Sequence, residues 1–423
     1  MEIFITIVIT FIASCLFWFF VVNVSVGEKK ITEPLQPDFS VGDEQFVRVM
    51  GGLLGPGIIS GNRVKALRNG DEIFEAMLEA IAHAKETITF ETYIYWSGKI
   101  GERFSHLLSE RARAGVKVHV LLDWAGAFKI DDHYLEEMRE AGVEVERFHP
   151  LRWYTLSRLN NRTHRKLLIV DGKIGFTGGV GISDKWTGHA QDEDHWRDSH
   201  FQIEGPSVTQ MQATFIDNWI KVRGCVLLKD MYFPKIEPVG SMQAQVFKSS
   251  RDEGSESVRL MYLLSIAAAK KSIRLSASYF VPDTLALDTL VQARGRGVEI
   301  EVIVPGPKID SKITRRASRA RWGKLLDAGV AIYEFQPTMY HCKVLIVDDI
   351  WVSVGSTNFD NRSFRLNAEA NLNILDHEFA LEQARTFEAD KARSHRMTRE
   401  EYDHRPLREK VIEHLAELFR SQL

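Results

Sequence analysis

Two short segments of the chain carry the same three polar residues in the same order and at the same spacing. The two sets are His164, Lys166 and Asp171, and His341, Lys343 and Asp348. An imidazole can act as a nucleophile or as a general acid, and an ammonium group can hold a phosphate. One copy would be a weak signal, but two copies with matched spacing predict a single bipartite site. We therefore take these six residues as the candidate catalytic set.

Each motif leads into a short apolar run, at 167–170 and at 344–347, that is typical of a buried strand. Residues two apart on a strand point to one side, so each His is expected to lie beside its Lys. Asp171 and Asp348 lie one strand length away, too far to touch the His of their own copy. We expect them to hold the following turn or to pair with a basic group. A third His-x-Lys, at His83, lacks the Asp and reads as part of a helix.

Three further pairs of segments match between the two halves and indicate an internal duplication. The pairs are 81–88 with 266–273, 113–123 with 294–304, and 141–150 with 328–337. The first pair reads as a helix end that runs into a strand, and the second as a helix that ends at glycine before a strand. Strands that alternate with helices predict an α/β fold made of two repeated layered domains.

The boundaries of these domains follow from changes in composition along the chain. We place a transmembrane anchor at 3–26, a connector at 27–60, a first domain at 61–230, a second domain at 240–395 and a C-terminal helix at 396–423. In the tail, Leu407, Val411, Leu415, Leu418 and Phe419 recur at helical spacing, which predicts an amphipathic helix. We favour docking of this helix on the body over contact with a membrane.

The N-terminus has an apolar segment, Ile3 to Val26, without a charged residue. A helix of that length rises about 36 Å, enough to cross a bilayer core. A cleaved signal peptide is the alternative, but Glu2 replaces the usual basic start and no cleavage site stands out. Lys29 and Lys30 follow the segment, so the positive-inside rule favours a catalytic part in the cytoplasm.

The composition of the 423 residues is that of an ordinary globular protein with room for two full cores. A net charge of −3 gives no overall basic field, which argues against a nucleic-acid binder. The three cysteines, Cys15, Cys225 and Cys342, form neither a disulfide framework nor a metal-binding spacing.

The duplicated motif, together with the Gly355-Ser-Thr-Asn358 segment after its second copy, resembles the phospholipase D superfamily. More narrowly, the chain is similar to bacterial cardiolipin synthases. The apolar N-terminus, the segment 161–166 and the segment 196–206 carry this likeness. The resemblance covers about residues 60 to 395. It implies two α/β domains related by a pseudo-twofold axis, with both motifs at their interface.

The first half departs from the family pattern. It reads Gly178-Gly-Val-Gly181, so the counterparts of Ser356 and Asn358 are glycines. Ser356 and Asn358 are candidate donors to a phosphate oxygen, and the first half would have to use backbone amides instead. The departure leaves the His-Lys core unchanged.

A catalytic histidine needs its second ring nitrogen oriented, usually by a carboxylate. Alignment of the strands after each motif matches Asp198 with Glu369. We expect Asp198 to orient His164 and Glu369 to orient His341. By the family's usual order, His164 would be the nucleophile and His341 the acid and base, although the residues themselves do not separate the two roles.

Two-step chemistry through a phosphohistidine requires no metal and no other cofactor. The cluster of His195 and His200 near Asp192 and Asp194 is therefore not assigned a metal.

The resemblance implies that the chain transfers a phosphatidyl group between phosphatidylglycerol molecules, which releases glycerol and yields cardiolipin. The expected partners are these phospholipids and a bacterial inner membrane, with no nucleic acid. Water as acceptor would give phosphatidic acid, which is the hydrolase alternative. A metal-independent nuclease of the same superfamily is less favoured because of the charge and the apolar N-terminus, and a non-enzymatic scaffold because both motifs are intact.

Overall fold

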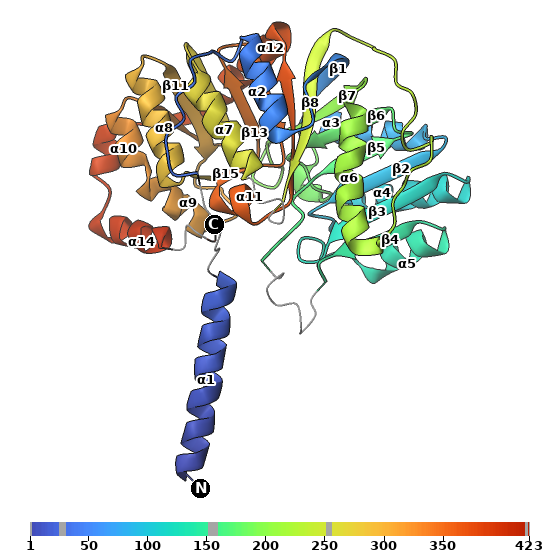
Figure 1. Cartoon of the computed structure of the whole chain (residues 1–423), viewed down its shortest axis with the longest axis horizontal. Coiled ribbons are helices and arrows are strands. Elements are labelled where there is room, and N and C mark those ends of the chain that lie inside the picture. Colours follow the sequence, from blue (N-terminus) through green and yellow to red (C-terminus); the bar gives the residue numbers. More distant parts are fainter. Residues whose placement is uncertain (1, 25–30, 151–159, 251–255, 419–421, 423) are drawn as a thin grey trace.

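The computed structural model describes residues 2–24, 31–150, 160–250, 256–418 and 422 of the chain. Figure 1 shows a rounded body with one long helix, α1 (Glu2–Val24), that extends from its lower side. Within the described residues, no helix combines the length and the apolar character needed to cross a membrane, so the expected transmembrane span is not shown. Lys29 and Lys30, on which the expected orientation depends, lie outside the described residues.

A single sheet of fifteen strands, counted over the described residues, runs through the body (Figure 1). The first half supplies β1 (Ile59–Arg68), β2 (Thr87–Thr92), β3 (Lys117–Asp123), β4 (Glu144–Phe148), β5 (Leu167–Val170), β6 (Ile174–Gly178) and β7 (Ser199–Glu204). The second half supplies β8 (Met242–Ser249), β9 (Ser272–Ala277), β11 (Glu299–Pro305), β12 (Ala331–Phe335), β13 (Lys343–Val347), β14 (Trp351–Gly355), β16 (Glu369–Leu375) and β17 (Ser394–Met397). A separate parallel pair joins β10 (Phe280–Val281) to β15 (Phe359–Asp360).

The order of the strands shows the duplication. From the centre outward the first half reads β1-β7-β6-β5-β2-β3-β4, and the second half reads β8-β16-β14-β13-β9-β11-β12, with β17 added at the edge. The two central strands, β1 and β8, pair antiparallel, with Ile59 opposite Ala244. Matching orders that meet at an antiparallel pair are related by an approximate twofold axis between these strands. The expected α/β fold of two repeats is confirmed.

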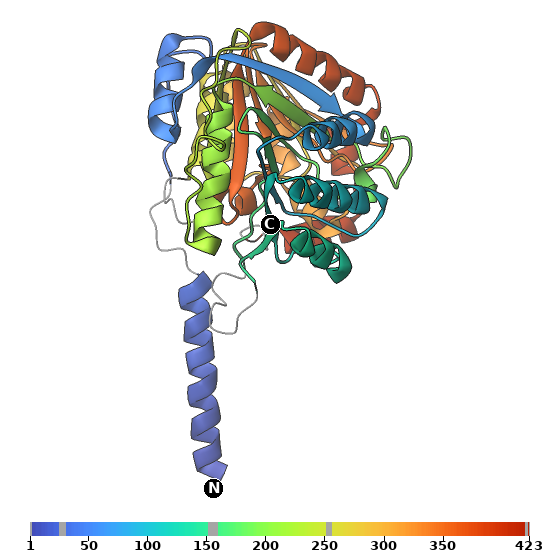
Figure 2. The same ribbon diagram turned by 90° about the vertical axis from the view of Figure 1, so that its right-hand side faces the viewer.

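Helices cover both faces of the sheet (Figures 1 and 2). On the first half lie α3 (Asn69–Ala82), α4 (Lys99–Arg113) and α5 (Asp132–Glu140); on the second lie α7 (Ser257–Ala268), α8 (Thr284–Gly295), α9 (Lys312–Ala320) and α10 (Trp322–Asp327). Helix α6 (Val208–Arg223) packs on strands of the first half and on β8, and α12 (His377–Lys391) packs on strands of the second half. Smaller elements are η2 (Asp184–Trp186), α11 (Asn361–Arg365), α13 (Arg399–Asp403) and α14 (Leu407–Glu417).

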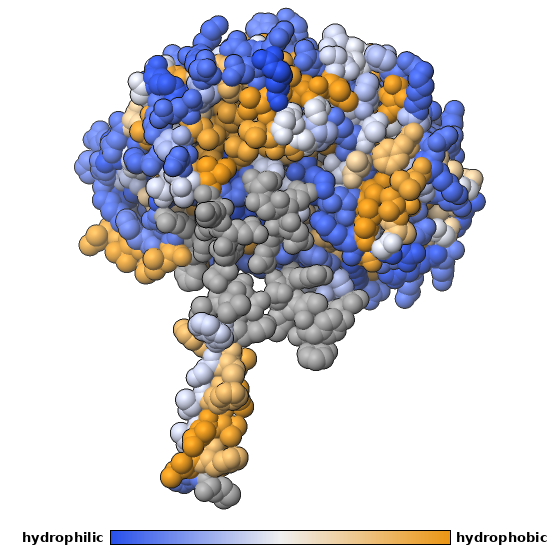
Figure 3. All heavy atoms as spheres, viewed as in Figure 1, coloured by the Kyte–Doolittle hydropathy of each residue, from blue (hydrophilic) through white to orange (hydrophobic). Residues whose placement is uncertain are grey.

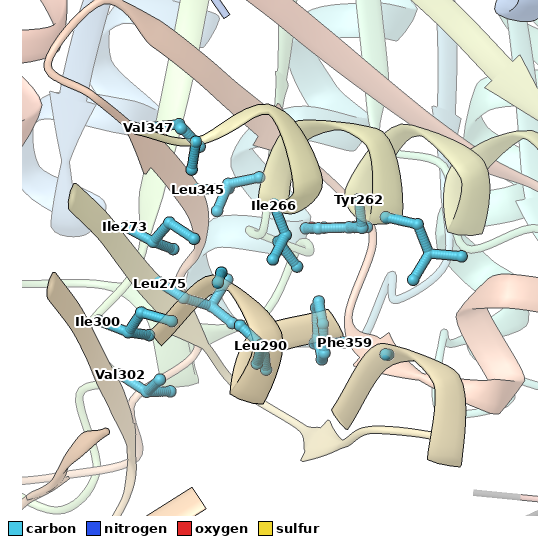
Figure 4. Close-up of a cluster of buried hydrophobic side chains, with 14 of the residues drawn as sticks. Tyr262, Ile266, Ile273, Leu275, Leu290, Ile300, Val302, Leu345, Val347 and Phe359 are labelled. Carbon is cyan, nitrogen blue, oxygen red and sulfur yellow. The ribbon is translucent and has the colours of Figure 1, made fainter. Parts of the chain in front are cut away.

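Three large apolar clusters among the described residues hold these layers together. One lies within the first half, around residues such as Phe74 and Phe104. A second lies within the second half, where Figure 4 shows Ile266 of α7, Leu275 of β9 and Leu290 of α8 pointing toward one another. The third contains residues of both halves, including those of α6 and α12. Burial of this shared cluster fixes the two halves against each other, which a bipartite site requires.

The expected connector contains a helix, α2 (Glu44–Leu54), although Gly51 and Gly52 lie within it. Its apolar face is buried against the second half, and Phe46 meets Trp351 edge to face at 4.9 Å between ring centroids. Tertiary burial of this face outweighs the low helix propensity of two adjacent glycines.

The aspartates of the two motifs lie at the far ends of β5 and β13 from their histidines. Asp171 accepts hydrogen bonds from the backbone N–H groups of Lys85, Glu86 and Thr87 at 2.8 to 3.2 Å. Asp348 accepts the equivalent bonds from residues 270–272 at 2.7 to 2.9 Å. Each carboxylate therefore ties the start of one strand to the end of its neighbour.

Removal of either carboxylate should destabilise the fold without touching the chemistry. We expect Asp171→Ala and Asp348→Ala each to lower the free energy of unfolding by about 1–3 kcal/mol, because three backbone donors lose their acceptor. Thermal unfolding followed by circular dichroism would measure the loss, with exposed Asp230→Ala as the matched control. A variant that unfolds like the wild type would contradict this structural role.

Candidate active site

The structure brings the His and Lys residues of both motifs together at the interface of the two halves. His164 and Lys166 stand just before β5, and His341 and Lys343 stand at the start of β13, which occupies the equivalent position in the strand order. His164, Lys166 and His341 line a cavity of about 550 Å³. The cavity takes its walls from both halves, as the duplicated motif predicts.

Each histidine pairs with the carboxylate of the opposite half. His164 Nδ1 lies 3.1 Å from both carboxylate oxygens of Glu369. His341 Nδ1 lies 2.7 Å from Oδ2 of Asp198. The expected assignment of Asp198 to His164 and Glu369 to His341 is therefore wrong: the two carboxylates are the right pair, but they are exchanged.

Backbone hydrogen bonds across the interface explain this exchange. The N–H of His164 donates to the carbonyl of Ala368 at 2.8 Å, one residue before Glu369. In the same way, the N–H of His341 donates to the carbonyl of Arg197 at 2.8 Å, one residue before Asp198. The strand end of one half thus runs beside the motif of the other. Alignment within each half cannot reveal this pairing, because the bonds that create it cross between halves.

In the second half, side chains hold Glu369 in place. The Ser356 hydroxyl donates to Oε2 of Glu369, and the Asn367 amide donates to Oε1 at 3.3 Å. Ser356 is fully buried and does not line the cavity. Its expected role as a phosphate donor is therefore wrong in this structure, because its proton is used to hold the carboxylate.

In the first half, Asp198 occupies the space that a serine would need. A Cβ placed on Gly179, the counterpart of Ser356, would lie 2.2 Å from Oδ1 of Asp198. The donor comes instead from the indole of Trp186 on η2, whose Nε1 lies 2.9 Å from Oδ2. Gly179 is thus needed for close approach, and Trp186 does the work of the absent hydroxyl.

Asn358 lines the cavity, and its Oδ1 accepts a hydrogen bond from the Ser278 hydroxyl at 2.6 Å. The amide nitrogen of Asn358 is then the group that can donate to a phosphate oxygen. Its counterpart Gly181 packs tightly, since an added Cβ would lie 2.8 Å from Ile94.

The two lysines have different surroundings. Lys343 donates to the Ser278 hydroxyl and to the carbonyl of His341, both at 2.8 Å. Lys166 donates to the carbonyl of His164 at 2.7 Å and lies 5.6 Å from the ring centre of Tyr93. Burial, together with repulsion from Lys343, lowers the pKa of Lys166 to about 7. Burial also lowers the pKa of Lys343. An incoming phosphate would favour the charged form of both.

Burial lowers the pKa of His164 to about 4, despite the carboxylate beside it. Burial and the Lys343 ammonium lower the pKa of His341. Burial alone would raise the pKa of Asp198 and Glu369, but their histidine partners and the lysines bring each below its usual value. Near neutral pH the carboxylates are thus ionised and accept a proton from Nδ1, which leaves the Nε2 lone pair of each neutral imidazole for chemistry.

Other residues of the cavity are not suggested by the motifs. Trp186 and Trp196 meet at 4.6 Å between ring centroids, and both contact the ring of His341. Further lining residues are the cations Lys129, Lys185, Arg162 and Arg362, the carboxylates Asp310 and Asp360, and the aromatic residues Trp96 and Tyr279. Trp196 could have been predicted as a cavity residue because it lies two residues before Asp198 in the sequence. No pattern in the sequence predicts Trp186.

Among the described residues, no group of three or more His, Cys, Asp or Glu side chains is placed to hold a metal ion. His195 instead pairs with Asp192 at 2.6 Å, and Lys185 donates to Asp194. His200 is buried beneath Gly178.

The family model described as "Cardiolipin synthase, PLD-like domain" matches residues 77–219 and 262–391, one segment in each half. A protein named cardiolipin synthase from Geobacillus kaustophilus is 35% identical over 360 residues, which cover 84% of this chain and 72% of that protein. Cardiolipin synthase 2 from Staphylococcus epidermidis is 33% identical over 390 residues, covering 90% and 80% respectively.

Among solved structures, a phosphatidylserine synthase from Haemophilus influenzae superposes with a TM-score of 0.68 over 90% of this chain and 99% of that one. At 14% identity this likeness shows a shared fold alone. The identity to the named relatives and the paired match of the family model carry the assignment. The chain belongs to the cardiolipin synthase family of phospholipase D-like phosphatidyltransferases.

Proposed function

We propose that the protein makes cardiolipin by moving a phosphatidyl group from one phosphatidylglycerol to another through a phosphohistidine. The observation that carries this proposal is the pair of crossed His–carboxylate contacts, with two buried lysines beside them, around one cavity. Two oriented imidazoles that share one phosphate can divide a substitution into two steps.

In the first step, His164 Nε2 attacks phosphorus, and the bond from phosphorus to the glycerol oxygen breaks. The negative charge of the entering phosphodiester favours uptake of a proton at Nε2 of His341, and His341 then gives this proton to the leaving oxygen, so glycerol departs neutral. The lysines offset the charge that builds on the phosphate oxygens. We assign attack to His164 by the usual order of the family, and its lowered pKa of about 4 supports this role because the ring is unprotonated at neutral pH.

In the second step, the hydroxyl of another phosphatidylglycerol enters the place that glycerol left. His341 removes its proton, the new oxygen–phosphorus bond forms, and the bond from phosphorus to His164 breaks. Asp198 keeps His341 in one orientation while it gives and then takes a proton. Glu369 holds His164 for attack.

We further propose that the protein works at the bacterial inner membrane, attached through α1, with its catalytic part in the cytoplasm. Exposed apolar side chains along α1, including Ile3, Phe11 and Trp18, support attachment. We propose catalytic domains at 61–230 and 240–395, limits compatible with the two segments that match the family model.

The product identifies the reaction. Purified protein in detergent, given phosphatidylglycerol alone, should release glycerol and form cardiolipin, both measured by mass spectrometry. Phosphatidic acid as the main product would establish the hydrolase alternative. The absence of both products would refute the proposal.

We expect His164→Ala and His341→Ala each to lower turnover by about 10³-fold or more. The exposed histidine of the incomplete motif, His83→Ala, is the matched control and should leave turnover unchanged.

The crossed support of Asp198 can be tested through the glycine that makes room for it. Gly179→Ala should displace the carboxylate from His341 and lower kcat by about 10²-fold, the scale of a misplaced catalytic group. Gly52→Ala is the control, since an added Cβ there meets nothing within 4 Å. Wild-type turnover by Gly179→Ala would show that the position of Asp198 is not required.

The buried ammonium of Lys166 predicts a stability effect with a definite dependence on pH. Its pKa falls from 10.5 to about 7 on folding, so the folded state is disfavoured fully below pH 7 and progressively less as the pH rises toward 10.5. Lys166→Met should therefore raise the free energy of unfolding by about 1–3 kcal/mol at pH 6 and by less at pH 9. Thermal unfolding at the two pH values would measure the difference. Exposed Lys173→Met should show no such gap. An equal effect at both pH values would contradict the burial of a charge here.

A further inference from the structure

The C-terminal helix α14 packs on the body through a charged face and leaves its apolar face exposed, whereas an amphipathic helix normally buries its apolar face. Its inner face carries Glu413, 3% exposed, held by Arg405 and by Arg319 at 3.3 Å. Ala416 completes the contact with Ala317 of α9. The prediction that this helix docks on the body is confirmed, but a charged face makes the contact.

The outer face of α14 carries an apolar stripe, which we define as Leu407, Val411, Leu415 and Leu418. These side chains are 77%, 51%, 55% and 75% exposed. Their spacing places them on one side of the helix. Figure 3 shows hydrophobic atoms at the lower left of the body, where Figure 1 places α14. A helix that buries a carboxylate and exposes four large apolar residues is unfavourable in water alone, so another apolar phase is needed to cover the stripe.

Residues near α14 line the catalytic cavity. Gln422, four residues beyond Leu418, lines the cavity and accepts a hydrogen bond from Asn160 at 2.7 Å. Thr314 of α9, the helix on which α14 packs, also lines it. On the first half, Phe128 lines the cavity and is 70% exposed. Phe128 therefore gives the cavity an apolar border on the first half, while on the second half the cavity is lined by residues of α9 and of the chain beyond α14.

The same side of the body carries α1. In Figures 1 and 2, α1 extends away from the underside, near the C-terminus. Exposed cations lie on α9 and α14 at Lys312, Arg316 and Arg408. An apolar stripe with cations beside it is the composition of a surface that binds anionic lipid.

We propose that the α14 stripe and Phe128 form a docking surface that inserts into the near leaflet of a bilayer of anionic phospholipid. This insertion would hold the catalytic cavity against the membrane. The proposal rests on the proposed function, because the phospholipid substrates lie in that bilayer. Docking lets a lipid headgroup reach the histidines while its acyl chains remain in the apolar phase.

A second copy of the chain fits the stripe less well. An 11-residue helix is about 16 Å long, and one of its faces offers a few hundred Å². Stable protein interfaces bury about 800 Å² on each partner. The stripe is too small for a lasting dimer but large enough to add to a membrane attachment that already exists.

The depth of the stripe can be measured in the full-length protein. Cys15→Ser and Cys225→Ser remove the exposed thiols, and Val411→Cys then receives a polarity-sensitive fluorophore. In vesicles of equal phosphatidylglycerol and phosphatidylcholine, the emission should shift to the blue and be quenched by lipids with brominated acyl chains. The matched position is Lys173→Cys, exposed at the far end of β5, where neither change is expected. An unquenched label at position 411 would overturn the proposal.

Charged substitutions in the stripe test membrane docking separately from catalysis. We expect Val411→Asp combined with Leu415→Asp to lower turnover of vesicle phosphatidylglycerol by about tenfold or more, because two apolar contacts with lipid are lost. Turnover of short-chain phosphatidylglycerol below its micelle concentration should stay at the wild-type level. Glu409→Gln is the control on the same helix and should leave both activities unchanged.

Two results of this experiment would overturn the docking surface. An equal loss on both substrates would make the stripe a structural feature of the catalytic body. Self-association of the wild type, abolished by the double variant in light scattering, would make a second copy the occupant. If the wild type turned over neither substrate, the proposed function would fail, and the quenching measurement would still decide the docking surface.

Discussion

The structure depends on compensation of charge at one buried interface. Two ammonium groups and two imidazoles lie out of water there, and each would be costly alone. Asp198 and Glu369 supply the compensating charge, and each reaches the histidine of the other half. The shared apolar cluster, which includes residues of α6 and α12, keeps water from these two pairs and fixes their spacing.

The two halves solve the same problem with different side chains. Glu369 is held by a hydroxyl and an amide, while the shorter Asp198 is held by an indole, over a glycine that leaves it room. The lysines differ similarly, one beside Ser278 and the other beside the ring of Tyr93. Two histidines with different surroundings can have different proton affinities, which a division into nucleophile and acid requires.

Local patterns predicted those features that depend on neighbours in the sequence. Buried strands at both motifs, the duplication, and the structural position of Asp171 and Asp348 all follow from spacing and polarity. The exchanged carboxylates do not, because strand alignment says which residues correspond but not which half each one reaches. Trp186 lies on a short turn with no repeat signal. Amphipathic spacing predicted α14, but spacing alone cannot say which face is buried, since the ion pairs of Glu413 reversed the usual choice.

The crossed contacts also bear on how such a chain could have arisen. One half alone contains a histidine and a carboxylate, but not a histidine that a carboxylate orients. A single-copy ancestor would therefore have been competent only as a symmetric homodimer, assembled about the axis that now runs between β1 and β8. Fusion of two copies would then have released each from the demand to be identical. The difference between Ser356 in one half and Gly179 with Trp186 in the other is a divergence that only a fused chain permits.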